Sequence, residues 1–256
     1  MAGSARAESD QPAPFDPTAT SARLLGWCGD ALSQVLRVVL RVDITVSGLE
    51  AQAFAGGPVV IAANHLSLVD TPLIRYLLPT AVRDRTFTVG ARDFFAPAPS
   101  DRGIRRIARQ LLCDCIVGSY RVCLIGRGDD MGDGLAKIRA LLRDGWNVIL
   151  FPEGTRSRTG TMGRFRSGVA QIARESAVAV LPVHIRGTES ILPVGGRWIH
   201  SAPLAVTFGH PMRVCADESN LEFLGRLRAE IESLGRACAA QESPLPRDSS
   251  DPHDGR

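Results

Sequence analysis

Apolar positions in this chain gather into short, β-branched runs that alternate with segments of helical period. Runs of this kind are typical of strands that are buried on both faces. We expect strands at residues 43–49, 59–63, 86–90, 122–127, 146–151, 178–185 and 204–208. We expect helices at residues 71–78, 104–113, 133–142, 168–176 and from 219 onward. The alternation predicts an α/β fold, a single layer-type domain in which helices flank a largely parallel central sheet.

The two ends of the chain differ in composition from its middle. Residues 1–20 and 241–256 are polar and rich in proline, which predicts disordered tails on either side of one domain at 43–240. Residues 21–42 are mostly apolar but include Asp30, Arg37 and Arg41. Such a segment favours an amphipathic helix on a membrane surface over a membrane span, and the alternative is a helix packed on the domain's own core.

Helix boundaries can be predicted from capping residues. Pro72 is suited to the first position of the 71–78 helix, which Thr71 or Asp70 would cap. Asp133 would cap the 133–142 helix and Gly145 would end it. Ser219 and Glu222 have the spacing of a capping box. The helix that this box begins should turn one apolar face toward the core, formed by Leu221, Leu224, Leu227, Ile231 and Leu234.

Charge and cysteine content narrow the function only slightly. The net charge of +3 is too small to indicate a nucleic-acid partner, and of the 30 basic residues only Lys137 is a lysine. The six cysteines form no CxxC pair, which favours reduced thiols over disulfides or a metal site. No secretory signal pattern occurs at the N-terminus. Four arginines lie along one side of the 104–113 helix; a solvated face is the simpler interpretation, and contact with anionic lipid headgroups is the alternative.

His65 and Asp70 stand at the end of the apolar run 59–63, where a strand gives way to a helix. In an open parallel sheet, the carboxyl ends of the strands are where substrates bind. A neutral His65 could accept a proton from a substrate hydroxyl or amine, while Asp70 fixes its tautomer and stabilises the imidazolium. A short pattern recurs by chance, so an ordinary loop histidine and a capping aspartate are the alternative.

A second polar stretch, 153–157, follows the buried strand at 146–151. Gly154 would let backbone amides approach a ligand, Thr155 and Ser157 supply hydroxyls, and Arg156 matches the oxygens of a phosphate. Further arginines follow at 158, 164 and 166, ahead of a helix N-terminus that favours anions. The stretch predicts a phosphate clamp, for which a turn and a solvated loop are the alternative.

Together these motifs resemble the glycerolipid acyltransferase family. The resemblance rests on Asn64-His65-x-Ser67-x-x-Asp70 and on the run from Phe151 to Ser157, and it extends to Arg127 and to Leu181-Pro182-Val183. It covers roughly residues 43–214. It implies transfer of a fatty acyl group from acyl-CoA or acyl-carrier protein to the free hydroxyl of 1-acylglycerol-3-phosphate, giving phosphatidic acid without a metal or redox cofactor.

The resemblance also implies roles for individual residues. His65 would be the general base and Asp70 its orienting partner. The glycerol phosphate would be held by Arg127, Glu153, Gly154, Thr155 and Arg156. The enzyme would lie peripherally on the cytoplasmic face of the cell membrane, with the lysophospholipid acceptor, the acyl donor and the membrane surface as its partners and no nucleic acid.

Two departures from the family pattern keep alternatives open. Arg92 stands where relatives often carry a lysine near the reacting carbonyl, so it is a candidate oxyanion partner. Arg121 and Gly126 stand where a glycine and an acidic residue are common. The acceptor could therefore be another lysolipid, such as a lyso-ornithine lipid, and a non-catalytic membrane-binding scaffold is the third hypothesis.

Overall fold

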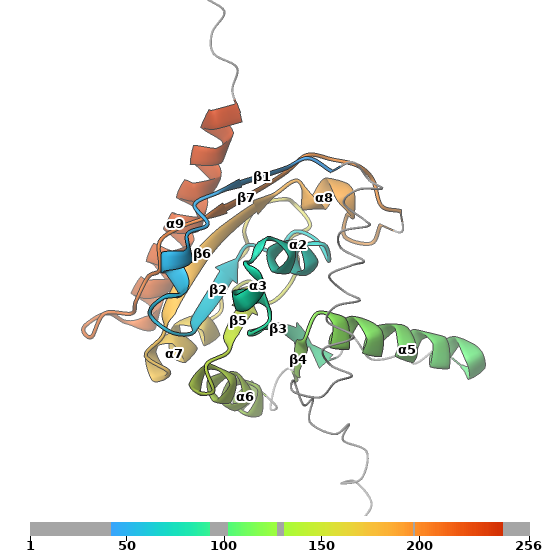
Figure 1. Cartoon of the computed structure of the whole chain (residues 1–256), viewed down its shortest axis with the longest axis horizontal. Helices are drawn as coiled ribbons and strands as arrows, with labels where there is room; N and C mark the ends of the chain where they lie inside the picture. The colour runs from blue at the N-terminus through green and yellow to red at the C-terminus, as the bar shows by residue number, and fades with distance from the viewer. Residues whose placement is uncertain (1–41, 93–101, 127–130, 197, 243–256) are drawn as a thin grey trace, which may run out of the picture.

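The computed structural model describes residues 42–92, 102–126, 131–196 and 198–242. A seven-stranded sheet forms its centre, in the order β1-β7-β6-β2-β5-β3-β4 (Figure 1). The strands are β1 Ile44–Ser47, β2 Val59–Ala63, β3 Thr86–Ala91, β4 Val122–Ile125, β5 Asn147–Leu150, β6 Ala179–Arg186 and β7 Leu204–Phe208. Neighbouring strands are parallel except β6 and β7, which are antiparallel. The predicted α/β fold with a largely parallel sheet is confirmed.

Helices follow the strands much as the pattern of apolar residues predicts. The long ones are α2 Asp70–Leu77, α5 Gly103–Ser119, α6 Met131–Arg143, α7 Gly168–Glu175 and α9 Asn220–Glu242. Three further helical segments of four residues each were not predicted, η1 Ala51–Phe54, α3 Thr80–Arg83 and α8 Thr188–Ile191. The predicted membrane-surface helix at 21–42 lies outside the described residues, apart from its last position. No helix in the described ranges combines the length and the apolar character that crossing a bilayer requires.

Strand β2 shows how the sheet divides the core into two layers. All five of its residues are buried, as expected for a strand covered on both faces. Val59 and Ile61 pack in one layer, with apolar residues of η1, α2 and α8. Val60 and Ala62 pack in the other, with residues of α6, α7 and α9. Because successive strand residues point to opposite faces, this run of valine, isoleucine and alanine contributes to both layers.

Two of the predicted caps are wrong. Helix α2 begins at Asp70 with Val69 as its N-cap, and no side chain caps it. Helix α6 begins at Met131, so Asp133 lies within its first turn. Asp133 still favours the helix there, because an acidic side chain interacts well with the N-terminal end of the helix dipole. Helix α5 extends six residues beyond its predicted end; three of the four predicted arginines lie in it, and Arg102 is its N-cap.

The last helix, α9, has its predicted capping box, but the set of residues that it turns toward the core differs from the predicted one. The Ser219 amide donates to the Glu222 carboxylate (2.7 Å), and the Glu222 amide donates to the Ser219 hydroxyl (3.2 Å). Leu221 was expected in the core but is 74% exposed, while Phe223 is fully buried. Leu221 lies about 120° around the helix axis from the buried Leu227, so it cannot share the face that packs on the sheet.

His184 on β6 packs against α9 at Gly235. A Cβ at Gly235 would lie 2.6 Å from His184 Nε2, so glycine allows the histidine ring to approach the helix backbone. Burial and, to a lesser extent, the neighbouring Arg186 charge lower the pKa of His184 below its ordinary value of 6.5. The fold therefore favours the neutral imidazole at this position.

This lowered pKa predicts a pH-dependent stability. Between the ordinary pKa and the lower folded one, the unfolded chain binds the proton and the folded chain does not, so the free energy of unfolding should fall as the pH decreases below 6.5. His184→Gln should show a shallower fall, because glutamine does not titrate. Urea unfolding of both proteins between neutral and mildly acidic pH measures the difference, and parallel pH profiles would contradict it.

Candidate active site

The two motifs meet at the carboxyl edge of the sheet. Strands β2 and β5 are adjacent and parallel, so the loops that follow them emerge side by side. The Ser157 amide donates to the His65 carbonyl across this junction (2.8 Å). Residues that are far apart in the sequence therefore come together where a parallel sheet places its ligands.

His65 and Asp70 form the hydrogen-bonded pair that their spacing suggests. His65 Nδ1 lies 2.8 Å from Asp70 Oδ2, and the Asp70 side chain is fully buried. The amides of Leu66 and Ser67 donate to the same oxygen (2.7 and 2.9 Å), and the Thr188 hydroxyl donates to Oδ1 (2.5 Å). A carboxylate accepts hydrogen bonds, so Nδ1 carries the ring proton of a neutral His65 and leaves Nε2 as the basic nitrogen.

Phe151 holds the imidazole from a second direction. Its ring stacks on that of His65 at a centroid distance of 3.9 Å and an interplanar angle of 15°. Phe151 directly follows β5, so the second motif also contributes to the orientation of the histidine in the first. Stacking and the Asp70 hydrogen bond together fix both the plane and the tautomer of His65.

The other polar residues of the first motif attach its loop to the sheet. Asn64 donates to the Ile185 carbonyl on β6 (2.8 Å) and accepts from the Ile185 amide (2.7 Å). The Ser67 hydroxyl donates to the Leu192 carbonyl, just after α8 (2.7 Å). Both side chains are buried and satisfied, so they fix the loop in place.

Glu153 differs from the residues that follow it in the second motif, because its side chain is buried and hydrogen-bonded to backbone amides. Its carboxylate accepts from the His65 amide at Oε1 (2.9 Å) and from the Gly163 amide at Oε2 (2.8 Å). The side chain is only 6% exposed. Both oxygens thus bind backbone on the two sides of the site, an arrangement suited to holding the loops together.

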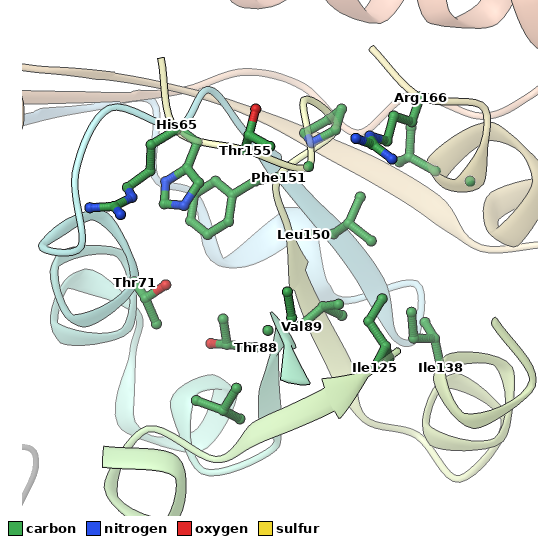
Figure 2. Close-up of a pocket in the computed structure, with 18 of the residues that line it drawn as sticks. His65, Thr71, Thr88, Val89, Ile125, Ile138, Leu150, Phe151, Thr155 and Arg166 are labelled. Atoms are coloured by element: carbon green, nitrogen blue, oxygen red, sulfur yellow. The ribbon is translucent and has the colours of Figure 1, made fainter. Parts of the chain in front are cut away.

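A cavity of about 1030 Å³ opens beside His65. Figure 2 shows His65 and Phe151 on one side of it, with Val89, Ile125 and Ile138 on the other. The walls farther from His65 are mostly apolar and come from β3, β4, β5, α6 and α7. The volume lies at the upper end of the usual range for ligand sites, roughly 300–1,000 Å³. The cavity can hold a long apolar group whose polar end reaches the histidine.

Basic residues border the same cavity. Arg156, Arg158 and Arg166 line it, together with Gly154 and Thr155 of the second motif. Burial lowers the pKa of the Arg156 guanidinium; the Asp70 charge opposes this shift and the Arg158 charge adds to it. Arginine remains charged throughout the physiological range. The cavity therefore combines an apolar interior with a cationic border.

Gly154 has a conformation and a neighbour that require glycine. Its φ is +68°, and an added Cβ would lie 2.6 Å from Nε of Arg166. The left-handed backbone and the close guanidinium both disfavour a side chain. Glycine at this position therefore lets the Arg166 guanidinium approach the backbone of the second motif. The predicted approach of a ligand to the same backbone stays a prediction.

Of the remaining predicted residues, Arg92 does not join this arrangement. Arg92 follows β3 but is exposed and is not among the residues that line the cavity. Arg127 lies outside the described residues, although Gly126, directly before it, lines the cavity. Their roles as oxyanion partner and phosphate ligand remain predictions.

Arg121 has a structural role in the fold and is not placed to contact the acceptor lipid. Its φ is +49°, a value that glycine adopts most easily, which fits the glycine that the family resemblance leads us to expect here. Its guanidinium donates to the Asp84 carbonyl (2.9 Å) and lies 5.7 Å from the ring centroid of Trp146. The side chain is buried and lines no part of the cavity, so it offers no contact to a bound lipid.

The hydrogen bonds of Glu153 predict a loss of stability on its neutralisation. In Glu153→Gln, the NH₂ group would meet one of the two donor amides, so one buried hydrogen bond should be lost at a cost of about 1–3 kcal/mol. The Tm of the ligand-free protein should fall by several degrees. Thr155→Ala, at an exposed neighbour in the same motif, should leave Tm nearly unchanged. Equal Tm values for the two variants would show that Glu153 does not hold these loops.

Comparisons with known proteins agree with this geometry. The sequence matches the family described as Acyltransferase over residues 43–186, more than half of the chain. The chain is 29% identical over 163 residues to the chloroplastic 1-acyl-sn-glycerol-3-phosphate acyltransferase LPAT1 of Arabidopsis thaliana, covering 61% of this chain and 39% of that protein. It is 40% identical over 161 residues to BAT2, the chloroplastic enzyme of the same name from Brassica napus, covering 60% and 40%.

A further match covers more residues at a lower sequence identity. The 1-acyl-sn-glycerol-3-phosphate acyltransferase of Cocos nucifera is 25% identical over 192 residues, 72% of this chain and 54% of that protein. The chain thus spans between 39% and 54% of the length of these three relatives. The crystal structure of the 1-acyl-sn-glycerophosphate (LPA) acyltransferase PlsC from Thermotoga maritima shares the fold, with a TM-score of 0.61, 20% identity, and coverage of 91% of this chain and 86% of that one. The chain belongs to the Acyltransferase family.

Proposed function

We propose that this protein transfers a fatty acyl group from acyl-CoA or acyl-carrier protein to the free hydroxyl of 1-acylglycerol-3-phosphate, forming phosphatidic acid. One observation carries the proposal. His65, held on Asp70 at 2.8 Å, borders a largely apolar cavity that Arg156 also lines, and the charge of Arg156 interacts with that of Asp70. A base beside a phosphate ligand at the mouth of an apolar cavity suits a hydroxyl that arrives on a lipid phosphate. The names of the relatives support the same substrate.

The reaction follows from the tautomer of His65. Nε2 takes the proton of the acceptor hydroxyl while its oxygen forms a bond to the thioester carbonyl carbon. The tetrahedral intermediate then breaks its C–S bond, and the imidazolium returns the proton to the leaving thiolate. Asp70 stabilises the imidazolium through Nδ1 in both steps. A thioester is already activated, so a base, a held acceptor and stabilisation of the oxyanion are sufficient.

The acceptor phosphate would bind at the cationic border of the cavity. Gly154, Thr155 and Arg156 all line the cavity. Arg158 and Arg166 add charge there, and the N-terminal end of α7 opens nearby at Ser167, which also lines it. Arg127 would complete this set, and Arg92 would contact the oxyanion. The geometry of Glu153 favours a positioning role over direct contact with the phosphate.

The acyl chain would occupy the apolar part of the cavity. Side chains from several strands and helices form its walls, among them Val89, Leu150 and Ile172. A bound acyl chain would also exclude water from much of the site, which would limit hydrolysis of the donor. Both substrates carry acyl chains that prefer a bilayer, so the enzyme would work peripherally at the cytoplasmic face of the membrane, with residues 21–42 as a surface helix. No nucleic acid takes part.

Acyl transfer from a radiolabelled acyl-CoA to lysophosphatidic acid in detergent micelles tests the proposal. We expect transfer by the native protein and a loss of at least about a thousandfold in His65→Ala, because the general base is removed. Lyso-ornithine lipid and lysophosphatidylcholine serve as parallel acceptors, and acyl-carrier protein as a second donor.

The panel separates the alternatives. Transfer only to another lysolipid would keep the mechanism and change the acceptor. Liposome binding without transfer to any acceptor from either donor would indicate a non-catalytic membrane-binding protein. Undiminished transfer by a folded His65→Ala protein would overturn the assigned base.

Thr188 is a positioning residue in this mechanism. Thr188→Val removes the hydroxyl that donates to Asp70 Oδ1 and leaves a buried acceptor unsatisfied, at about 1–3 kcal/mol. If this cost falls on the transition state, kcat should drop roughly five- to hundredfold, with little change in KM. Thr188→Ser should retain most of the activity, because serine keeps the hydroxyl. Equal kcat values for the valine and serine variants would show that this hydrogen bond does not support catalysis.

A further inference from the structure

Helix α5 is left largely uncovered by the described chain. Every residue from Gly103 to Leu111 is exposed, and the main packing partner of the helix among the described elements is β4. In Figure 1, α5 extends away from the sheet and from the other helices of the protein. Among the residues that the structure describes, none gives residues 103–111 the contact with a core that amphipathic helices usually have.

The exposed part of α5 nevertheless carries an apolar stripe. Ile104, Ile107 and Leu111 are 84%, 60% and 60% exposed, and their spacing places them on one side of the helix. We call these three side chains the α5 apolar face. Exposed isoleucine and leucine in one contiguous stripe are uncommon on the surface of a soluble protein and mark a contact site.

The rest of the helix surface in this region is cationic. Arg102, Arg105, Arg106 and Arg109 precede or accompany the stripe, and no acidic residue occurs between positions 102 and 113. Three of these arginines lie on the flank or the far side of the helix from the α5 apolar face. An apolar stripe combined with arginine alone as the charged residue is typical of a helix that lies in the interface of an anionic bilayer.

The other end of α5 reaches the cavity. Ile116 and Tyr120, in and directly after its last turn, line the cavity beside His65. One helix thus runs from the wall of the proposed lipid site to a projecting apolar and cationic surface. This continuity favours a lipid surface over an acidic protein as the occupant, because a lipid must travel between a bilayer and the cavity.

We infer that α5 docks the protein on an anionic phospholipid bilayer. The α5 apolar face enters the boundary between headgroups and acyl chains, and the arginines contact the phosphates. The inference rests on the proposed function for the lipid nature of the substrate, but docking itself needs no turnover. It assigns to α5 a membrane contact separate from the one proposed for residues 21–42.

Co-sedimentation of the full chain with vesicles tests the inference. We expect binding to vesicles of phosphatidylglycerol and phosphatidylcholine, and weaker binding to phosphatidylcholine alone. Replacing Ile104, Ile107 and Leu111 together by serine should reduce binding to the anionic vesicles about tenfold or more. Replacing Arg105, Arg106 and Arg109 together by glutamine should reduce it up to roughly a hundredfold at low salt, and the reduction should shrink as salt is added.

Leu221→Ser is the matched control, since Leu221 is a leucine on α9 whose exposure falls between those of Leu111 and Ile104, and its replacement should leave binding unchanged. The substituted positions are exposed, so Tm should not fall; a large fall would mean that the chain itself covers this face, and would overturn the inference. Unchanged vesicle binding by the triple serine variant would overturn it as well. A change in its oligomeric state without a change in vesicle binding would identify a subunit interface instead.

Turnover measured with water-soluble short-chain donor and acceptor separates this inference from the proposed function. The triple serine variant should keep native rates in that assay and lose rate only on vesicles. A native protein that binds vesicles through α5 but transfers no acyl group would retain the docking surface and reject the acyltransferase reaction.

Discussion

The burial of the Asp70 carboxylate is the constraint on which the site depends. A carboxylate removed from water is stable only when it is fully hydrogen-bonded, and an unpaired one costs several kcal/mol. Four donors meet this requirement at Asp70: the His65 ring, the amides of Leu66 and Ser67, and the Thr188 hydroxyl. The loop after β2 wraps around the carboxylate for this reason. The orientation of His65 is therefore a consequence of how the protein solvates an internal charge.

Glu153 places the same kind of constraint on the opposite side of the histidine. Asp70 holds the His65 ring, and Glu153 holds its backbone amide and links it to Gly163. The interaction is possible only because β2 and β5 are neighbours in the sheet, although 88 residues separate the two partners. Each motif is thus incomplete alone: one supplies the base, and the other supplies the carboxylate and the aromatic ring that fix its position.

Sequence patterns predicted the parts of the molecule that depend on local physics. The strands and the long helices follow from hydrophobic period, and the pairing of His65 with Asp70 follows from a five-residue separation that one loop can close. Capping was less predictable: Asp70 satisfies every requirement of a cap, yet its carboxylate accepts from the loop and Val69 becomes the N-cap. Competition between a helix terminus and a histidine for one carboxylate is decided by tertiary structure.

Features that need the strand order could not be predicted. Thr188 bonds Asp70 only because β6 lies beside β2, and nothing in the local sequence of either segment indicates that contact. Arg121 shows the opposite kind of error. An arginine near a candidate phosphate site looks from the sequence like a residue that binds the phosphate. Its positive φ and its contact with Trp146 instead place it inside the fold. Short helices such as α3 were missed because four residues carry too little periodicity to be recognised.

The position of His65 also bears on how the proposed reaction would avoid hydrolysis. Phe151 covers one face of the ring, Asp70 occupies Nδ1, and the side chain is only 17% exposed. A hydroxyl therefore reaches the base most directly through the cavity, whose inner walls are apolar and hold water poorly. An acceptor whose phosphate binds the arginines at the border keeps its hydroxyl beside the base for far longer than a water molecule does. Selection of a lipid alcohol over water would then follow from the placement of charge around the cavity, with the histidine itself equally reactive toward both.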